Sequence, residues 1–509
     1  MFERTSTFVL AALGVVCVAV ALAMLSAAED GVVREAVSVG TKPATVYRPA
    51  DGRRGPAIVI AHGFAGSQQL MQSFSFTLAR NGYTAVTFDF AGHGRNPSPL
   101  TGDITREDGA TETLIAETER ILAYARPLGD GRLALLGHSM ASDIIVRTAA
   151  RHPEVAATIA VSMFSPAVTR EIPKNLLVVV GDWEGMLKTE ALRAVGLATS
   201  PEAAQERVTY GEFASGTARR AAFVPNTEHV SILFARETMQ EMIDWLDAVF
   251  ERPRVVTPEI AVRGPWIALL FLGIALLAHP ATRLLPVVSP RPLGAGLVWQ
   301  QLWLPLILPA IATPLILRFV PTHFLPVLVG DYLAVHFGLY GAITALCLWM
   351  RRAALPDAAL QIPLSRALAA ATAILVALYA VGLGWPLDRH FTSFVPSEGR
   401  LGLIGAMAIG TALYFLADEW LTRGEGAAKG AHFVSKVAFL ASLALATALD
   451  FERLFFLMII VPLIVLFFTF FGIVSRWVYR RTGHPWVAAL ANAVAIAWAI
   501  GVTFPLVAG

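Results

Sequence analysis

A serine lies in the stretch LALLGHSMASD, residues 133–143, between an apolar run typical of a buried strand and a segment with helical spacing. A serine hydroxyl is a weak nucleophile at neutral pH unless a neighbouring base takes its proton. Histidine is the usual base, and a carboxylate keeps the imidazole in the required tautomer. The chemistry open to Ser139 therefore depends on whether the fold brings a histidine and an acid to it. The alternative role of Ser139 is a helix N-cap.

Two further segments carry candidate partners. His229 lies in FVPNTEHVSILF, after the last apolar run of the first half of the chain and at the entry to a helix-like segment. Asp182 and Glu184 lie in VVVGDWEGM, directly after another apolar run. Either carboxylate could orient the imidazole of His229, and the other would then be a loop or capping acid. His229 by itself could also be a surface or capping residue.

The elements that must position these side chains can be read from the apolar runs. Residues 32–39 and 43–48 alternate like a hairpin, and buried-strand runs follow at 57–61, 84–88, 132–136, 156–162, 176–180 and 220–225. Helical patterns lie between most of them, at 67–80, 112–126, 140–151 and 230–250. This alternation predicts an α/β fold with a mostly parallel eight-stranded sheet and helices on both faces. Ser139, both acids and His229 each follow a strand, so we expect them at one edge of the sheet.

With these segments in place, the soluble part of the chain resembles the α/β-hydrolase fold family of serine hydrolases, which includes esterases and lipases. The resemblance covers about residues 32–250. It rests on HGF (62–64), DFAGHG (89–94), GHSMA (137–141), a late acid and a carboxyl-terminal histidine in the order Ser, acid, His. Ala141 departs from the family's second elbow glycine, which puts the tightness of the turn in question.

The resemblance assigns roles to individual residues. The family's spacing of glycine, two residues and acid matches Glu184 and makes Asp182 the alternative acid. The backbone N–H groups of Phe64 and Met140 would form the oxyanion hole. His62 would support its turn and His93 would order its loop. No cofactor and no metal are implied.

The rest of the chain is membrane-like. Apolar residues make up 55% of the 509 residues, above the roughly 45–50% of soluble domains. Residues 7–27 form an apolar run long enough to cross a bilayer, and its length favours a retained signal anchor over a cleaved signal peptide. Eight further spans are predicted, at 265–284, 297–317, 325–349, 366–385, 401–421, 432–449, 454–475 and 486–507. They form an all-α transmembrane bundle.

The predicted domains are a transmembrane signal anchor (1–28), an α/β-hydrolase domain (29–251), a linker (252–263) and a polytopic transmembrane domain (264–509). Lys and Arg are concentrated in the loops that are cytoplasmic if the N-terminus is cytoplasmic. Nine crossings then leave the hydrolase domain extracytoplasmic, that is, periplasmic or extracellular. The net charge of +2 gives no indication of nucleic-acid binding, and the two cysteines lie in apolar spans where a disulfide is not expected.

These features predict an integral-membrane serine hydrolase that cleaves carboxylic esters through an acyl-enzyme. Only Met163 to Asn175 separate two late strands, so the domain has almost no cap, which favours an amphipathic or lipid-like ester. Membrane lipids are expected partners, and a homo-oligomer formed through the transmembrane domain is left open. The alternatives are an acyltransferase that uses the same residues, and a transporter or sensor with a non-catalytic hydrolase-like domain. Ionisable residues in or near the spans motivate the latter: Asp331, His336, Asp418, Glu419, Asp450 and Glu452.

Overall fold

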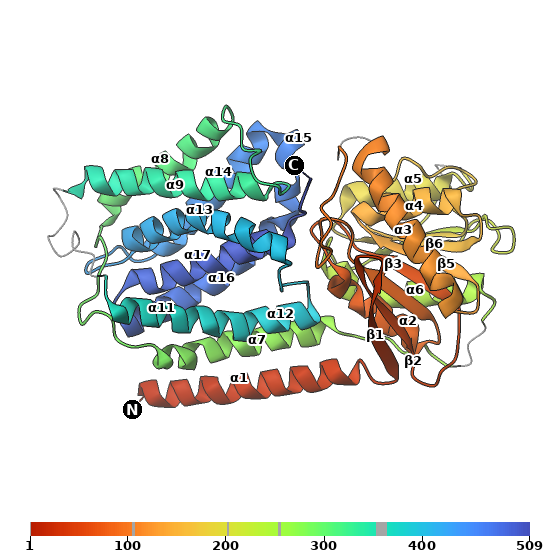
Figure 1. The fold of residues 1–509 in the computed structure, drawn as a ribbon, viewed down its shortest axis with the longest axis horizontal. Helices are drawn as coiled ribbons and strands as arrows, with labels where there is room; N and C mark the ends of the chain where they lie inside the picture. The colour runs from red at the N-terminus through yellow and green to blue at the C-terminus, as the bar shows by residue number, and fades with distance from the viewer. Residues whose placement is uncertain (1, 104–106, 201–202, 253–255, 353–363, 509) are drawn as a thin grey trace.

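Eight strands form one sheet in the order β1-β2-β4-β3-β5-β6-β7-β8 (Figure 1). The structure is a computed structural model that describes residues 2–103, 107–200, 203–252, 256–352 and 364–508. β1 pairs antiparallel with β2, β2 pairs antiparallel with β4, and all remaining pairs are parallel. The predicted hairpin and mostly parallel eight-stranded sheet are therefore confirmed. The strands are β1 Val32–Val39, β2 Lys42–Pro49, β3 Ala57–Ala61, β4 Thr84–Phe88, β5 Leu133–His138, β6 Val155–Val161, β7 Leu176–Gly181 and β8 Arg219–Val224.

Helices cover both faces of this sheet, so its central strands are buried along their whole length. Every residue of β3, β4, β5 and β7 is buried. Helices α2 (Gln72–Arg80) and α6 (Arg236–Val249) share one apolar core with the sheet. Helices α3 (Glu112–Ala125), α4 (Met140–Arg151) and α5 (Gly185–Gly196) pack on the other face. A strand buried on both sides has no polar face to alternate with. We call this part, residues 29–251, the sheet domain.

The second part is a bundle of long apolar helices (Figure 1). Within the described ranges, nine helices are long and apolar enough to cross a membrane, in agreement with the predicted number. The helices of this part are α1 Phe2–Ala27, α7 Gly264–Ala281, α8 Trp299–Leu317, α9 Gly330–Met350, α11 Arg366–Tyr379, α12 Trp385–His390, α13 Glu398–Thr422, α14 Ala431–Leu449, the short α15 Phe451–Leu454, α16 Phe456–Thr482 and α17 Pro485–Thr503. One span, Arg366–His390, runs continuously from α11 through residues 380–384 into α12.

The last helix is shorter than its hydropathy predicts. The apolar pattern continues to residue 507, but α17 ends at Thr503, and Phe504 adopts an extended conformation (φ −73°, ψ 144°). Pro505 accounts for this end, because a proline disfavours helical dihedrals in the residue before it. The prediction of a span over 486–507 is therefore wrong in its last four residues.

The extended C-terminal segment joins the bundle to the sheet domain. The Leu506 N–H donates to the carbonyl oxygen of Gly92 (2.9 Å), and the Leu100 N–H donates to that of Leu506 (2.8 Å). The guanidinium of Arg400, on α13, is completely buried and donates to the carbonyl oxygens of Phe504 (2.9 Å) and Gly92 (2.6 Å). Buried carbonyl groups need such donors, so this arginine stabilises the junction.

Other contacts join the same two surfaces. The Ser67 hydroxyl, after β3, accepts from the backbone N–H of Ser393 (2.9 Å), and Arg95, after β4, forms an ion pair with Asp388 (2.5 Å). These residues follow the carboxyl ends of β3 and β4. The carboxyl edge of the sheet, where the candidate site residues are expected, therefore faces the end of the helical bundle (Figure 1).

Candidate active site

Ser139 occupies a sharp turn between β5 and α4. Its backbone has φ 54° and ψ −120°, an unfavourable combination for a residue with a Cβ. Gly137 makes the turn feasible, because a Cβ at that position would lie 2.7 Å from the carbonyl oxygen of Ala141. The Ala141 methyl is fully buried in the core between the sheet and α3 and α4. The turn thus forms with Ala141 in place of the second elbow glycine that the resemblance led us to expect.

The structure brings His229 and Glu184 to Ser139. The Ser139 hydroxyl donates to Nε2 of His229 (Oγ–Nε2 2.8 Å), and Nδ1 of His229 donates to Oε1 of Glu184 (2.6 Å). His229 follows β8, and Glu184 lies between β7 and α5. The Glu184 side chain is 7% exposed and that of His229 is 23% exposed. The acid end of this hydrogen-bonded series is therefore buried, and the histidine and serine end is accessible from the surface.

The two candidate acids lie in the same loop after β7 but have different surroundings. Oε2 of Glu184 accepts from the Gly181 N–H (2.8 Å) and from the Ser162 hydroxyl (2.7 Å), so both oxygens of this carboxylate are held. Asp182 is exposed and forms an ion pair with Lys188 (2.6 Å). Of the two acids, Glu184 is the one that contacts His229.

Two residues that were not predicted support this arrangement. Ser162, directly after β6, holds Glu184 as described, and Nε2 of His138 donates to the carbonyl oxygen of His229 (2.9 Å). Both side chains are buried. The rule that located Ser139, a polar residue at the carboxyl end of a strand, also applies to Ser162. No sequence signal pairs His138 with His229, because 91 positions separate them.

The predicted oxyanion-hole residues flank the serine. Met140 is the first residue of α4, so its N–H belongs to the positive end of that helix. Phe64 follows Gly63 after β3, and a Cβ built on Gly63 would lie 3.0 Å from Cβ of Ser139. The HGF turn therefore runs directly over the serine. The role of the two N–H groups in catalysis stays a prediction.

His62 and His93 lie beneath this turn and not against Ser139. Nδ1 of His62 donates to the Gly63 carbonyl oxygen (2.8 Å), and its Nε2 accepts from the Phe90 N–H (3.2 Å). Nδ1 of His93 donates to the Ala91 carbonyl oxygen (2.9 Å). Burial lowers the pKa of His62 and lowers that of His93 to about 3, so both rings are neutral scaffold groups near neutral pH.

Exposed apolar side chains border the site. Phe164, Trp183 and Met186 are 66%, 68% and 86% exposed, and the last two flank Glu184 in sequence. Phe164 and Met186 also line a surface pocket of about 300 Å³ with Leu187, Thr189, Glu190 and Arg193.

The ionisable residues of the bundle are largely paired. Asp418, Glu419 and His432 have ligand-type atoms within 4.8 Å of one another, the one such cluster among the described residues. However, Asp418 forms an ion pair with Lys436, and Glu419 pairs with Arg423 (3.0 Å). Buried carboxylates neutralised in this way form an ion-pair network within the bundle rather than an open cation site.

Comparison with known proteins agrees with the geometry of the sheet domain. Residues 56–218 match the family described as the alpha/beta hydrolase fold. The sheet domain is an α/β-hydrolase domain. The match covers about a third of the chain and leaves the helical bundle without an assigned family.

One curated relative is a protein of Mycobacterium phage D29 named as a non-heme haloperoxidase, which is 35% identical over 99 residues. The aligned region is 19% of this chain and 32% of that protein, so the chain spans about a third of its relative's length. Among solved structures, a predicted CIB-like hydrolase from Thermoplasma acidophilum has 16% identity and a TM-score of 0.33, covering 42% of this chain and 97% of that one. A dienelactone hydrolase from Anabaena variabilis has 15% identity and a TM-score of 0.31, covering 43% and 97%.

Proposed function

We propose that this protein is an integral-membrane serine hydrolase that cleaves carboxylic esters of amphipathic or lipid character. The observation that supports it is the hydrogen-bonded series Ser139, His229 and Glu184, with Oγ–Nε2 and Nδ1–Oε1 distances of 2.8 and 2.6 Å. A helix N-cap serine needs neither a histidine within hydrogen-bond distance nor a strained backbone. An activated serine requires the adjacent base, and the strained turn is typical of the strand-to-helix elbow that exposes the nucleophile.

In the proposed acylation step, His229 Nε2 takes the proton of Ser139 as Oγ attacks the ester carbonyl carbon. The new Oγ–C bond gives a tetrahedral intermediate whose oxyanion accepts from the N–H groups of Met140 and Phe64. His229 then donates its proton to the alcohol oxygen as the ester C–O bond breaks. Glu184 stabilises the imidazolium and fixes its orientation.

The second step hydrolyses the acyl-enzyme and regenerates the free enzyme. Water enters on the side left by the alcohol, His229 takes one of its protons, and the hydroxide attacks the acyl carbon. Collapse of the second tetrahedral intermediate breaks the Oγ–C bond, releases the carboxylic acid and reprotonates Ser139. An acyltransferase would differ in this step alone, because an alcohol or amine would replace water.

The surroundings of the serine favour a substrate that is partly apolar. The exposed side chains of Phe164, Trp183 and Met186 offer an apolar border, and the loops after β3 and β4 lie against the membrane bundle. A domain held in this way meets substrates that concentrate at a bilayer surface.

Labelling with a fluorophosphonate tests the proposal. The reagent forms a P–O bond to an activated serine and releases fluoride, so we expect wild-type protein in detergent micelles to label. Ser139→Ala should abolish labelling and lower nitrophenyl ester hydrolysis at least about 10⁴-fold. Ser215→Ala, at an exposed serine outside the site, is the matched control and should label like wild type. The proposal would be contradicted if Ser139→Ala were labelled at the wild-type rate, or if the wild-type protein were not labelled at all.

A further inference from the structure

Three exposed apolar side chains lie just after the carboxyl ends of strands β6 and β7. They are Phe164, Trp183 and Met186, and we call them the apolar patch. Phe164 and Met186 line the same surface pocket of about 300 Å³, so the two connections are adjacent there. Exposed apolar groups that are contiguous are unusual on a protein surface and are typical of a site that contacts another protein or a lipid.

The apolar patch borders the candidate active site. The Phe164 N–H donates to the Ser142 hydroxyl (3.3 Å), and this hydroxyl donates to the carbonyl oxygen of Ser139 (2.6 Å). On the other loop, Met186 lies two residues after Glu184, the acid of the hydrogen-bonded series. The turns that hold the serine and the acid therefore lead directly to the apolar patch.

The apolar patch lies at the carboxyl edge of the sheet, which faces the end of the helical bundle (Figure 1). The bundle contacts this edge after β3 and β4, through Ser67 and Arg95. In the strand order β3-β5-β6-β7, strands β6 and β7 are two and three positions from β3, which corresponds to about 10 and 14 Å at the spacing of neighbouring strands. The side chains of the patch stay exposed, so the patch lies beside the part of the edge that the bundle covers.

The bundle carries exposed aromatic side chains at its end next to the sheet domain. Phe319 and Phe324 lie between α8 and α9 and are 85% and 59% exposed. In the same connection, the Leu328 N–H donates to the carbonyl oxygen of Pro505 (3.0 Å), in the C-terminal segment that joins the two parts. Large apolar groups exposed at the end of candidate spans are expected to contact lipid. A bilayer around the bundle therefore reaches the level of this end, next to the carboxyl edge of the sheet.

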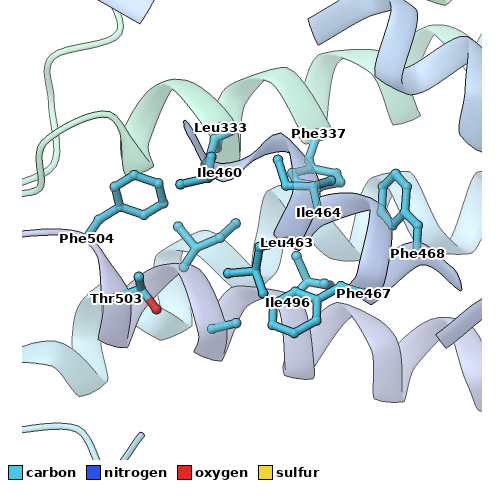
Figure 2. Close-up of a pocket in the computed structure, with 12 residues that line it drawn as sticks. Leu333, Phe337, Ile460, Leu463, Ile464, Phe467, Phe468, Ile496, Thr503 and Phe504 are labelled. Atoms are coloured by element: carbon cyan, nitrogen blue, oxygen red, sulfur yellow. The ribbon is translucent and has the colours of Figure 1, made fainter. Parts of the chain in front are cut away.

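The apolar cavity inside the bundle is too small for a lipid chain. Figure 2 shows this cavity, which lies between α9, α16 and α17 and is lined by residues such as Phe337, Ile464 and Phe504. Its volume is about 60 Å³, less than half of the about 150 Å³ of an apolar cavity that binds benzene. The bilayer beside the apolar patch, and not this cavity, is therefore the apolar phase that can hold a long acyl chain.

We propose that the apolar patch inserts into the head-group region of the leaflet around the bundle, so that the site takes its ester from the bilayer. This inference rests on the proposed function and names its partner as a lipid surface. Trp183 fits this position, because tryptophan is enriched at the interface between a membrane and water. Phe164 and Met186 add apolar area, whose burial at that interface is favourable.

The charges next to the apolar patch are compensated. Asp182 pairs with Lys188 (2.6 Å), and Glu190 pairs with Arg193 (2.6 Å). Attraction to anionic head groups needs a surplus of Lys and Arg, so burial of apolar area drives the insertion. We therefore expect the same depth of insertion in zwitterionic and in anionic bilayers.

Spin labelling measures the insertion without any catalytic step. With Cys17 and Cys347 replaced by serine, a nitroxide is attached at Met186→Cys in the full chain, reconstituted in phosphatidylcholine nanodiscs. The matched control is Ser215→Cys, at an exposed turn before β8 and therefore at the opposite edge of the sheet. Oxygen concentrates in lipid and a nickel chelate stays in water. The ratio of oxygen to nickel collision rates should be at least about threefold higher for the label at Met186→Cys than at Ser215→Cys.

Three outcomes would overturn the inference. Equal ratios for the two labels would place the apolar patch in water. Low accessibility of the label at Met186→Cys to both reagents would indicate a protein partner, such as a second copy of the chain. Insertion only in nanodiscs that contain phosphatidylglycerol would contradict insertion by apolar burial. Fluorophosphonate labelling of Ser139 on the unlabelled parent protein reports on the proposed function separately, since it does not depend on contact with lipid.

Hydrolysis rates test whether the inserted patch supplies the substrate. Met186→Asp places a charge in the apolar patch, and Ser215→Asp places one outside it. The measured quantity is the ratio of Ser139-dependent kcat/KM for a palmitoyl nitrophenyl ester in the nanodisc bilayer to that for the acetyl ester in water. Met186→Asp should lower this ratio at least about fivefold, because a charge at membrane depth is costly. Ser215→Asp should leave the ratio at the wild-type value.

The two proposals fail in different ways in this experiment. An unchanged ratio in Met186→Asp would overturn supply of the ester from the bilayer and leave the proposed function standing. Absence of Ser139-dependent hydrolysis of either ester by the wild type would overturn the proposed function itself.

Discussion

At the scale of single residues, the two acids after β7 show how a loop selects one of two similar groups. Asp182 and Glu184 are two positions apart, and both follow the strand. The turn directs Glu184 back to Gly181, Ser162 and His229, whereas Asp182 lies outward with Lys188. Side-chain length matters here, because the longer glutamate reaches His229 from the start of α5. The family's spacing favoured Glu184 in advance, but the residues themselves left both acids open.

Removing one charge at a time tests this selection. Glu184→Gln keeps the shape of the side chain but loses the charge that stabilises the imidazolium, and we expect kcat for a soluble nitrophenyl ester to fall about 10³–10⁴-fold. Asp182→Asn breaks an exposed ion pair and should change kcat by less than about twofold. Steady-state measurements give kcat for the two variants. A larger loss of kcat in Asp182→Asn than in Glu184→Gln would show that Asp182, and not Glu184, is the acid that acts on His229.

At the scale of elements, three buried histidines lie at the carboxyl edge of the sheet, next to the turns of the candidate active site. His62 follows β3, His93 lies in the loop after β4, and His138 ends β5. All three are at most 6% exposed, and burial lowers the pKa of each. The neutral rings stabilise the turns by hydrogen bonds to backbone groups, so protonation of these rings destabilises the folded state.

This arrangement predicts acid sensitivity. Because the folded pKa values lie below the unfolded value of 6.5, the stabilisation is present above about pH 6.5 and is lost as the pH falls toward the folded values. With a folded pKa of about 3, His93 alone should lower the free energy of unfolding by about 2 kcal/mol between about pH 7.5 and pH 5. Thermal unfolding in micelles across this range measures the effect. His93→Gln should reduce the pH dependence, and an unchanged dependence in that variant would count against the explanation.

At the scale of the whole molecule, the two termini lie at opposite ends of the bundle (Figure 1). The N-terminus is at the end remote from the hydrolase domain, and the C-terminal segment pairs with Leu100 and Gly92 of that domain. An odd number of crossings places the two termini at opposite ends of a bundle, and the nine candidate spans among the described residues are consistent with this placement. The Lys and Arg distribution leads us to propose a cytoplasmic N-terminus and an extracytoplasmic hydrolase domain.

Cysteine accessibility tests this orientation. With Cys17 and Cys347 replaced by serine, a single cysteine is introduced at Thr199 in the hydrolase domain or at Glu425 in the loop between α13 and α14. Both positions are exposed. A membrane-impermeant maleimide applied to intact cells should label Thr199→Cys and should label Glu425→Cys only after the cells are permeabilised. The reverse pattern would place the hydrolase domain in the cytoplasm.

The sequence by itself determined the features that depend on local pattern. Continuous apolar runs between helical segments predicted the eight-stranded sheet, because a strand that is buried on both faces is apolar along its length. Long apolar stretches predicted nine spans, because a helix in lipid must be apolar over about 20 residues. The positions of Ser139 and His229, each after a predicted strand, indicated that they meet at one edge of the sheet. Three features are visible only in the tertiary structure. Glu184 is the carboxylate that contacts His229, and the Ser162 hydroxyl donates to Glu184. Phe504 lies just beyond the end of α17 and packs against Phe64. These contacts join groups far apart in the chain or depend on how a loop turns, and neither hydropathy nor spacing carries that information.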